Sequence, residues 1–216
     1  MMAKATIKPT ELSFRPAKPE DAKVASGLIY ETFPQVATFT IGLGSEARAR
    51  AILEKIFTLP GHRLSFEETT LVTHQGRIVG ALAAYPASRL AKLDRRADRL
   101  ILKQYRLRGK IALAVRTWPL LFMKSVKRRD YVIGNLAVKQ AYRGKGIGGQ
   151  ILAQAEEKAK EASLKRLVLR VAIENKAAKA LYEKAGFKTT AMYLESNRRV
   201  KVAGAGYRWM VKDLSQ

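Results

Sequence analysis

Residues 131–149 read YVIGNLAVKQAYRGKGIGG, and this stretch decides the fold. A β-rich run at 131–138 leads through a short connection and several glycines into an amphipathic helix, whose apolar face carries Ile147, Ile151, Leu152, Ala155 and Ala159. Glycines at such a turn let the backbone approach a ligand closely, and the free N–H groups and dipole of the following helix favour an anion. The pattern therefore predicts a phosphate-binding loop at 143–148.

Two other phosphate motifs compete for the same glycines. Gly144, Gly146 and Gly149 satisfy the G-x-G-x-x-G pattern of dinucleotide-binding folds, with Glu174 as a candidate ribose ligand. A four-residue connection and an arginine separate the strand from these glycines, which disfavours that assignment. A nucleoside triphosphate loop fits less well, because no Gly-Lys-Ser/Thr follows four residues after a glycine. At this point a glycine-rich turn without a ligand remains the alternative to a phosphate site.

The rest of the sequence alternates between strand and helix patterns. Residues 12–16 predict a strand, and the helix after it is expected to bury one face with Val24, Leu28 and Ile29. Ser45 is a typical N-cap, and Gly76 is the turn residue of an antiparallel hairpin at 63–86. This order of elements indicates an α/β or α+β fold around a mixed sheet.

A second motif, NKAAKALYEKAGF at Asn175–Phe187, follows the β-rich run RLVLRVA at 166–172. Asn175 and Tyr182 are two helical turns apart, so we expect both side chains on one face. Together the two motifs resemble the GNAT superfamily of N-acetyltransferases, in which R/Q-x-x-G-x-G/A precedes N-x-x-A-x-x-L-Y-E-K-x-G-F. The matching positions are Arg143, Gly146, Gly148, Asn175, Ala178, Leu181, Tyr182, Glu183, Lys184, Gly186 and Phe187.

The resemblance implies a GNAT-type fold of the α/β (α+β) class. Its sheet is mixed, mostly antiparallel and seven-stranded, with helices on both sides and a parallel splayed pair of strands, here 131–138 and 166–172. The resemblance is strong over 131–193 and continues upstream as an order of elements. We expect one acetyltransferase domain over 1–216, with a helical insertion at 87–130 within it.

The same resemblance implies acetyl-CoA as co-substrate, with no metal. Its pantetheine arm would pair with the strand backbone at Leu136, Ala137 and Val138, and Asn175 would hydrogen-bond to it. Backbone amides would hold the pyrophosphate at Arg143, Gly144, Lys145, Gly146, Ile147, Gly148 and Gly149.

By this resemblance Tyr182 would lie near the sulfur as general acid. A phenol has a pKa of about 10, above that of a thiol at about 8.5, so it stays protonated at neutral pH. The alternative for Tyr182 is a core aromatic. A backbone N–H near Leu136 is a candidate to polarise the thioester carbonyl, and Gly134 would ease a bulge that splays the strands.

The general base and the acceptor stay open. Ribosomal-protein N-terminal acetyltransferases of this family have a glutamate base five residues before the asparagine, and Arg170 occupies that position here. That specific activity is therefore not predicted. Glu31, Glu67 and Glu68 are alternative bases, none of which the sequence selects. The acceptor is a primary amine on a small molecule, a lysine side chain or a protein N-terminus.

Basic residues dominate the composition. Lysine and arginine outnumber acids 41 to 18, which gives a net charge of +23 and attracts phosphates, nucleic acid or an anionic surface. Residues 87–130 contain fourteen lysines and arginines against three aspartates and have helical spacing that Pro119 interrupts. A lid over the acceptor, a surface-binding or partner-binding helix, a nucleic-acid patch and a solvated layer all remain open for this insertion.

Composition also excludes some classes. With zero cysteines there is no disulfide, thiolate nucleophile or thiolate metal site, and two histidines are too few for a histidine-only metal cluster. The sequence contains no apolar run of membrane-spanning length and no secretory signal pattern, so we expect a cytoplasmic protein without a transmembrane segment. Besides an acetyltransferase, a catalytically silent acyl-CoA-binding protein and a nucleic-acid-binding protein remain, and a homodimer is left open.

Overall fold

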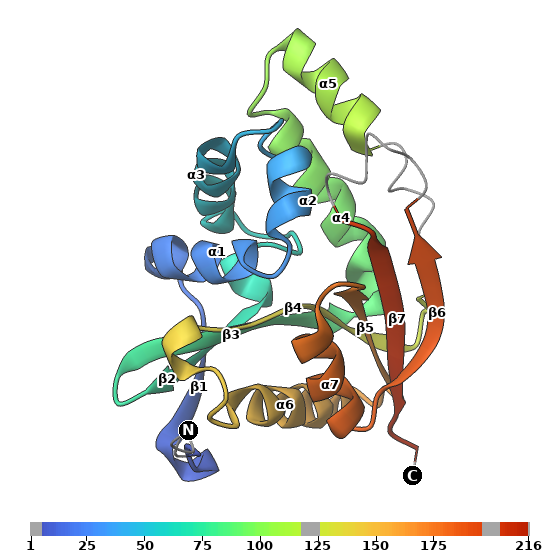
Figure 1. The fold of residues 1–216 in the computed structure, drawn as a ribbon. Helices are drawn as coiled ribbons and strands as arrows, with labels where there is room; N and C mark the ends of the chain where they lie inside the picture. The colour runs from blue at the N-terminus through green and yellow to red at the C-terminus, as the bar shows by residue number, and fades with distance from the viewer. Residues whose placement is uncertain (1–5, 118–125, 196–203, 216) are drawn as a thin grey trace.

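A seven-stranded sheet organises the computed structural model, which describes residues 6–117, 126–195 and 204–215 (Figure 1). The strand order is β1-β2-β3-β4-β5-β7-β6, and every neighbouring pair is antiparallel except β4 and β5, which are parallel. The predicted fold class is therefore confirmed. The strands are β1 (Leu12–Pro16), β2 (Thr69–His74), β3 (Arg77–Pro86), β4 (Asp130–Val138), β5 (Arg166–Ala172), β6 (Lys188–Leu194) and β7 (Gly206–Asp213).

Helices cover both faces of this sheet (Figure 1). One face carries α6 and α7, and the other carries α1, α3 and α4. The helices are α1 (Ala22–Tyr30), α2 (Pro34–Phe39), α3 (Glu46–Phe57), α4 (Ala87–Leu102), α5 (Leu107–Thr117), α6 (Ile147–Glu161) and α7 (Lys176–Lys184). Short 3-10 turns lie at Pro9–Glu11, Pro19–Asp21, Phe66–Glu68 and Gln140–Tyr142.

Side chains of the central strands alternate between the two faces. Ile133 and Leu169 belong to the core under α6, whereas Val132 packs with Leu93 of α4, and Ala137 lies in the core under α1 and α3. The five apolar residues predicted for the inner face of α6 are all buried. Both faces of β4 are thus covered.

One residue of a predicted helix face was wrong, while the other two were confirmed. Val24 is 36% exposed, while Leu28 and Ile29 are 3% and 1% exposed. The buried face of α1 also includes the small residues Ala22, Ala25 and Ser26. The prediction gave weight only to large apolar residues, so it wrongly included Val24 and left out Ala25. By contrast, Ser45 caps α3 as predicted, accepting a hydrogen bond from Arg48 N at 3.3 Å.

The first part of the predicted insertion folds as α4 and α5, whereas Pro119 lies outside the described residues. In α5 Leu113 is buried, and Arg116 ties the helix to α2, donating to Phe39 O at 2.7 Å. The outer side carries an apolar stripe, in which Leu107, Ile111 and Val115 are 73%, 57% and 66% exposed. Figure 1 shows α5 projecting from the end of the molecule far from α6. No helix in the described ranges combines the length and apolarity needed to cross a membrane.

Candidate active site

Strands β4 and β5 separate part-way along their length. Their parallel pairing runs from Asp130↔Arg166 to Ile133↔Leu169 and then ends within the described strands. Gly134 falls at a register irregularity between β3 and β4, as predicted, and Asn135 resumes pairing with Ala83. Beyond this point β4 remains paired with β3, and β5 remains paired with β7. The edges of β4 and β5 that face each other therefore have backbone groups without a strand partner. An extended arm can pair with such edges, and Leu136, Ala137 and Val138 lie along one of them.

An ion pair joins the two strands at the closed end of this split. The Asp130 carboxylate accepts from Arg166 Nε at 2.8 Å and from the second guanidinium nitrogen at 2.9 Å. Lys127 N also donates to it, at 2.6 Å. The Asp130 side chain is only 1% exposed, so this charge is buried and fully hydrogen-bonded. The pair thus joins the first two residues of the β4–β5 ladder.

The predicted phosphate loop presents a run of free amides. Among the described residues, the N–H groups of 144–149 donate to no protein acceptor, and the first bond of α6 runs from Gln150 N to Gly146 O at 3.4 Å. Gly144 and Gly146 have φ of +79° and +83°, values that glycine adopts without strain. Consecutive free N–H groups at a helix N-terminus form a binding site for phosphate groups.

Arg143 and Lys145 stand beside these amides. Arg143 is anchored by Nε to Val138 O at 2.9 Å and by an exposed ion pair to Glu31 at 3.0 Å. The Lys145 ammonium lies 5.2 Å from the centre of the Tyr142 ring. Both cations add positive potential to the loop.

The N-terminal segment also contacts this loop, a feature that the sequence did not predict. Ile7 N donates to Lys145 O at 3.0 Å, and Gln150 Nε2 donates back to Ile7 O at 2.8 Å. A Cβ at Gly146 would lie 3.1 Å from the Thr6 methyl group. No short-range motif marks such an interaction, because Ile7 and Gln150 are 143 residues apart.

Two adjacent glycines of α6 have different surroundings. A Cβ at Gly148 would lie 2.8 Å from a methyl group of Leu181 on α7, whereas a Cβ at Gly149 would meet nothing within 4 Å. Gly148 thus permits close contact between the helices that carry the two motifs. Gly149 leaves space beside the free amides.

Asn175 and Tyr182 lie at opposite ends of α7. Asn175 is the exposed N-cap, and its Oδ1 accepts from Ala178 N at 3.0 Å, which leaves the amide NH2 to donate elsewhere. Tyr182 is buried, with its ring 5.8 Å from that of Phe187. Its hydroxyl has no hydrogen-bond partner in the described part of the chain, and burial raises its pKa to about 12.

This arrangement of strands, loop and helix coincides with a match to a known family. The family model described as Acetyltransferase (GNAT) family matches residues 44–187. The chain belongs to the GNAT family.

Relatives agree with this GNAT assignment. A protein of Bacillus subtilis (strain 168), named as a ribosomal protein bS18-alanine N-acetyltransferase, is 40% identical over 57 residues, which cover 26% of this chain and 38% of that protein. A crystal structure of an N-acetyltransferase from Staphylococcus aureus Mu50 is similar with a TM-score of 0.69 at 20% identity, over 92% of this chain and 99% of that one. Another acetyltransferase crystal structure gives 0.67 at 21% identity, over 94% and 100%. The structural likenesses establish the GNAT fold.

Each of the three acids considered as the general base forms an ion pair or a hydrogen bond within the protein. Glu31 is paired with Arg143, and Glu67 accepts from Gly61 N at 2.7 Å. Glu68 is buried and forms a two-point ion pair with Arg89 at 2.5 and 3.2 Å. Burial raises the pKa of Glu68, although Arg89 opposes this shift. None of the three is therefore singled out as the base.

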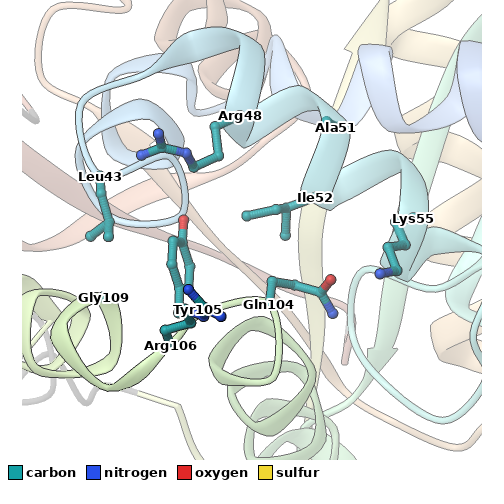
Figure 2. Close-up of a pocket in the computed structure, with 9 residues that line it drawn as sticks. All are labelled: Leu43, Arg48, Ala51, Ile52, Lys55, Gln104, Tyr105, Arg106 and Gly109. Atoms are coloured by element: carbon teal, nitrogen blue, oxygen red, sulfur yellow. The ribbon is translucent and has the colours of Figure 1, made fainter.

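A separate depression lies between α3 and the junction of α4 and α5 (Figure 2). Three cationic side chains, Arg48, Lys55 and Arg106, line it together with Tyr105, whose hydroxyl donates to Ile41 O. Its lining includes no residue of β4, β5, α6 or α7. The depression is therefore distinct from the strand split and the phosphate loop.

Proposed function

We propose that this GNAT protein transfers the acetyl group of acetyl-CoA directly to a primary amine. The observation that carries the proposal is the run of six amides at 144–149 that have no partner among the described residues, together with a strand split that leaves backbone edges open. The GNAT family uses acetyl-CoA. The amides would hold the pyrophosphate, and Leu136, Ala137 and Val138 would pair with the pantetheine arm.

The transfer itself needs two groups near the thioester. The amine nitrogen attacks the carbonyl carbon, and a backbone N–H near Leu136 would stabilise the negative oxygen that forms. The C–S bond then breaks, while the C–N bond formed in the attack remains. Tyr182 would donate its proton to the departing thiolate. A pKa of about 12 keeps that phenol protonated throughout the neutral range, and its hydroxyl lacks a competing protein partner among the described residues.

The attacking amine must first lose a proton. An amine with a pKa of about 10.4 is almost fully protonated at pH 7. We therefore expect water to carry this proton away, since the candidate acids are all engaged elsewhere. The activity of the Bacillus subtilis relative is not transferred to this chain, because Arg170 replaces the glutamate expected at that position.

The cofactor site is tested by calorimetric titration with acetyl-CoA. In Gly146→Glu, a side chain and a negative charge would enter the phosphate loop at a positive φ, and we expect binding to be lost. Gly76→Glu is the matched control, because Gly76 also has a positive φ of +74° and open space around it, but lies in the β2–β3 turn. Equal affinity of both variants and the wild type would overturn the proposed cofactor site.

The role of Tyr182 is tested separately by Tyr182→Phe. This change keeps the buried ring and removes only the hydroxyl. We expect kcat to fall roughly 10²- to 10⁴-fold while the Kd for acetyl-CoA changes little. An unchanged kcat would leave Tyr182 as a core aromatic.

Two other functions predict different results. A catalytically silent acyl-CoA-binding protein would bind acetyl-CoA yet release no free thiol with any amine. A nucleic-acid-binding protein using its basic surface would show an affinity that falls steeply with salt and ignores CoA.

A further inference from the structure

Arg170 is the first residue of β5 beyond the last pair with β4. Its neighbours Leu169 and Val171 point into the core under α6, so Arg170 projects from the opposite face of the sheet. Tyr85, which packs with Leu93 of α4, lies on that same face. A Cβ at Gly134 would lie 2.6 Å from the Tyr85 hydroxyl, which places this hydroxyl at the bulge where the split opens.

Two aromatic rings of β7 hold the Arg170 guanidinium. Its central carbon lies 5.4 Å from the centre of the Trp209 ring and 5.8 Å from that of Tyr207. Trp209 is directly opposite Arg170 in the β5–β7 ladder, and Tyr207 is opposite Ala172. Such contacts fix the plane of a guanidinium and leave its N–H edge able to donate.

This guanidinium lacks an anionic partner. Within the described residues, Arg170 makes neither an ion pair nor a hydrogen bond, whereas other arginines on the molecule pair with carboxylates, including Arg15, Arg63, Arg89, Arg143 and Arg166. The sequences 1–5, 118–125 and 196–203 contain no aspartate or glutamate. In the described ranges, the charge of Asp94 is felt at Arg170, but no carboxylate forms an ion pair with it.

The surroundings of Arg170 disfavour the charged form of its guanidinium. Desolvation by the surrounding protein lowers the pKa of Arg170, and the nearby charge of Arg63 lowers it further. The side chain is nevertheless exposed to solvent. The guanidinium is thus close to other protein groups and still accessible from solvent. A cation in such a place gains from an anionic ligand that solvent can deliver.

The position of Arg170 indicates which ligand this is. The phosphate loop lies at the N-terminus of α6, whereas Arg170 lies on the face opposite α6, beside the point where the acetyl group would pass between the strands. On the proposed function, that face receives the acceptor. One guanidinium balances one negative charge, and the adjacent Arg63 is already paired with Asp94 at 2.7 Å. A singly charged carboxylate matches this site better than a phosphate dianion.

We propose that Arg170, stacked on Tyr207 and Trp209, binds a carboxylate of the acceptor, so that the substrate is an amine that also carries a carboxylate. This inference rests on the proposed function and names its substrate class. The carboxylate belongs either to a free amino acid or to an acidic side chain beside a peptide N-terminus, and both present the same chemistry to Arg170.

Thiol release from acetyl-CoA with matched acceptors tests the inference. One pair of acceptors compares free amino acids with their amides, which tests recognition of a free amino acid. The other pair compares Ala-Asp amide with Ala-Asn amide, which tests recognition of an acidic side chain beside a peptide N-terminus. In Arg170→Gln we expect KM for the carboxylate-bearing acceptors to rise roughly 10- to 100-fold, with the neutral acceptors little changed. Arg170→Lys should restore part of the loss, because it keeps the charge but not the forked donors.

Arg95→Gln is the control variant, since it removes the same charge from an exposed position of α4. Calorimetry with acetyl-CoA on each variant distinguishes a defect at the acceptor site from a defect at the cofactor site. If acetyl-CoA binds normally and wild type and Arg170→Gln use charged and neutral acceptors alike, the inference is overturned and the proposed function stands. If the wild type does not bind acetyl-CoA, the proposed function itself fails.

Discussion

Asp130→Asn removes one charge from the ion pair at the closed end of the strand split while keeping the volume of the side chain. Removing one partner of a buried ion pair costs about 3–5 kcal/mol, because the remaining charge is left without compensation. Arg166 is 27% exposed and regains some hydration, so we expect a loss of about 2–3 kcal/mol. For a chain of this size that loss corresponds to a fall in Tm of roughly 4–12 °C.

Thermal unfolding followed by circular dichroism measures this loss. Glu183→Gln is the control, since its pair with Lys179 on α7 is exposed at 47% and 33% and the change should alter stability by less than about 0.5 kcal/mol. The double variant Asp130→Asn with Arg166→Gln should recover part of the loss, because neither charge is then left unpaired. If Asp130→Asn is no less stable than the control, the pair does not clamp the parallel strands and the reasoning is refuted.

Three further predictions concern other parts of the fold. Gly149→Ala should raise the free energy of unfolding by up to about 1 kcal/mol through helix propensity, whereas Gly148→Ala should gain nothing because its Cβ would strike α7; denaturant titration compares the two. Hydrogen bonds from Arg15 lower the pKa of Asp21 below its unfolded value, so the stability it contributes is present above about pH 4 and lost as the pH falls through the lowered pKa. Asp21→Asn should flatten this part of a urea-midpoint profile between pH 2 and 6. Ile111→Gln should leave Tm nearly unchanged and shorten retention on a hydrophobic column, since the side chain is 57% exposed; a large loss of Tm would contradict the exposed stripe of α5.

Much of the fold could be predicted because its signals are local. The predicted strand runs at 12–16 and 166–172 coincide with β1 and β5, and Gly76 lies in the predicted hairpin turn, with a positive φ. The short helix α2 was not predicted, since six residues offer too little periodicity. On α1, Leu28 and Ile29 were predicted correctly, but Val24 was wrongly placed on the buried face, because the buried alanines do not stand out in a hydrophobic pattern.

The candidate site also has parts that could be predicted from the sequence and parts that could not. The phosphate loop and α7 could be located from motifs, because glycines, a cap and a helix stop act over a few residues. The stacking of Arg170 on two rings of β7 could not be predicted, since it depends on the register between strands far apart in sequence. The sequence marked Arg170 only as a departure from a family pattern. The structure adds the neighbours that give this arginine a chemical role.

The contact between the N-terminal segment and the phosphate loop has a practical consequence. Gln150 and Ile7 are 143 residues apart, yet their hydrogen bond holds the segment against the loop that would receive the pyrophosphate. A fragment confined to the two motifs would contain every predicted contact residue and still lack this support. Pairings of such high sequence separation form late in folding, because their loop-closure entropy must be overcome first. Affinity tags are therefore better fused at the C-terminus, and truncations at the N-terminus should stop short of Thr6.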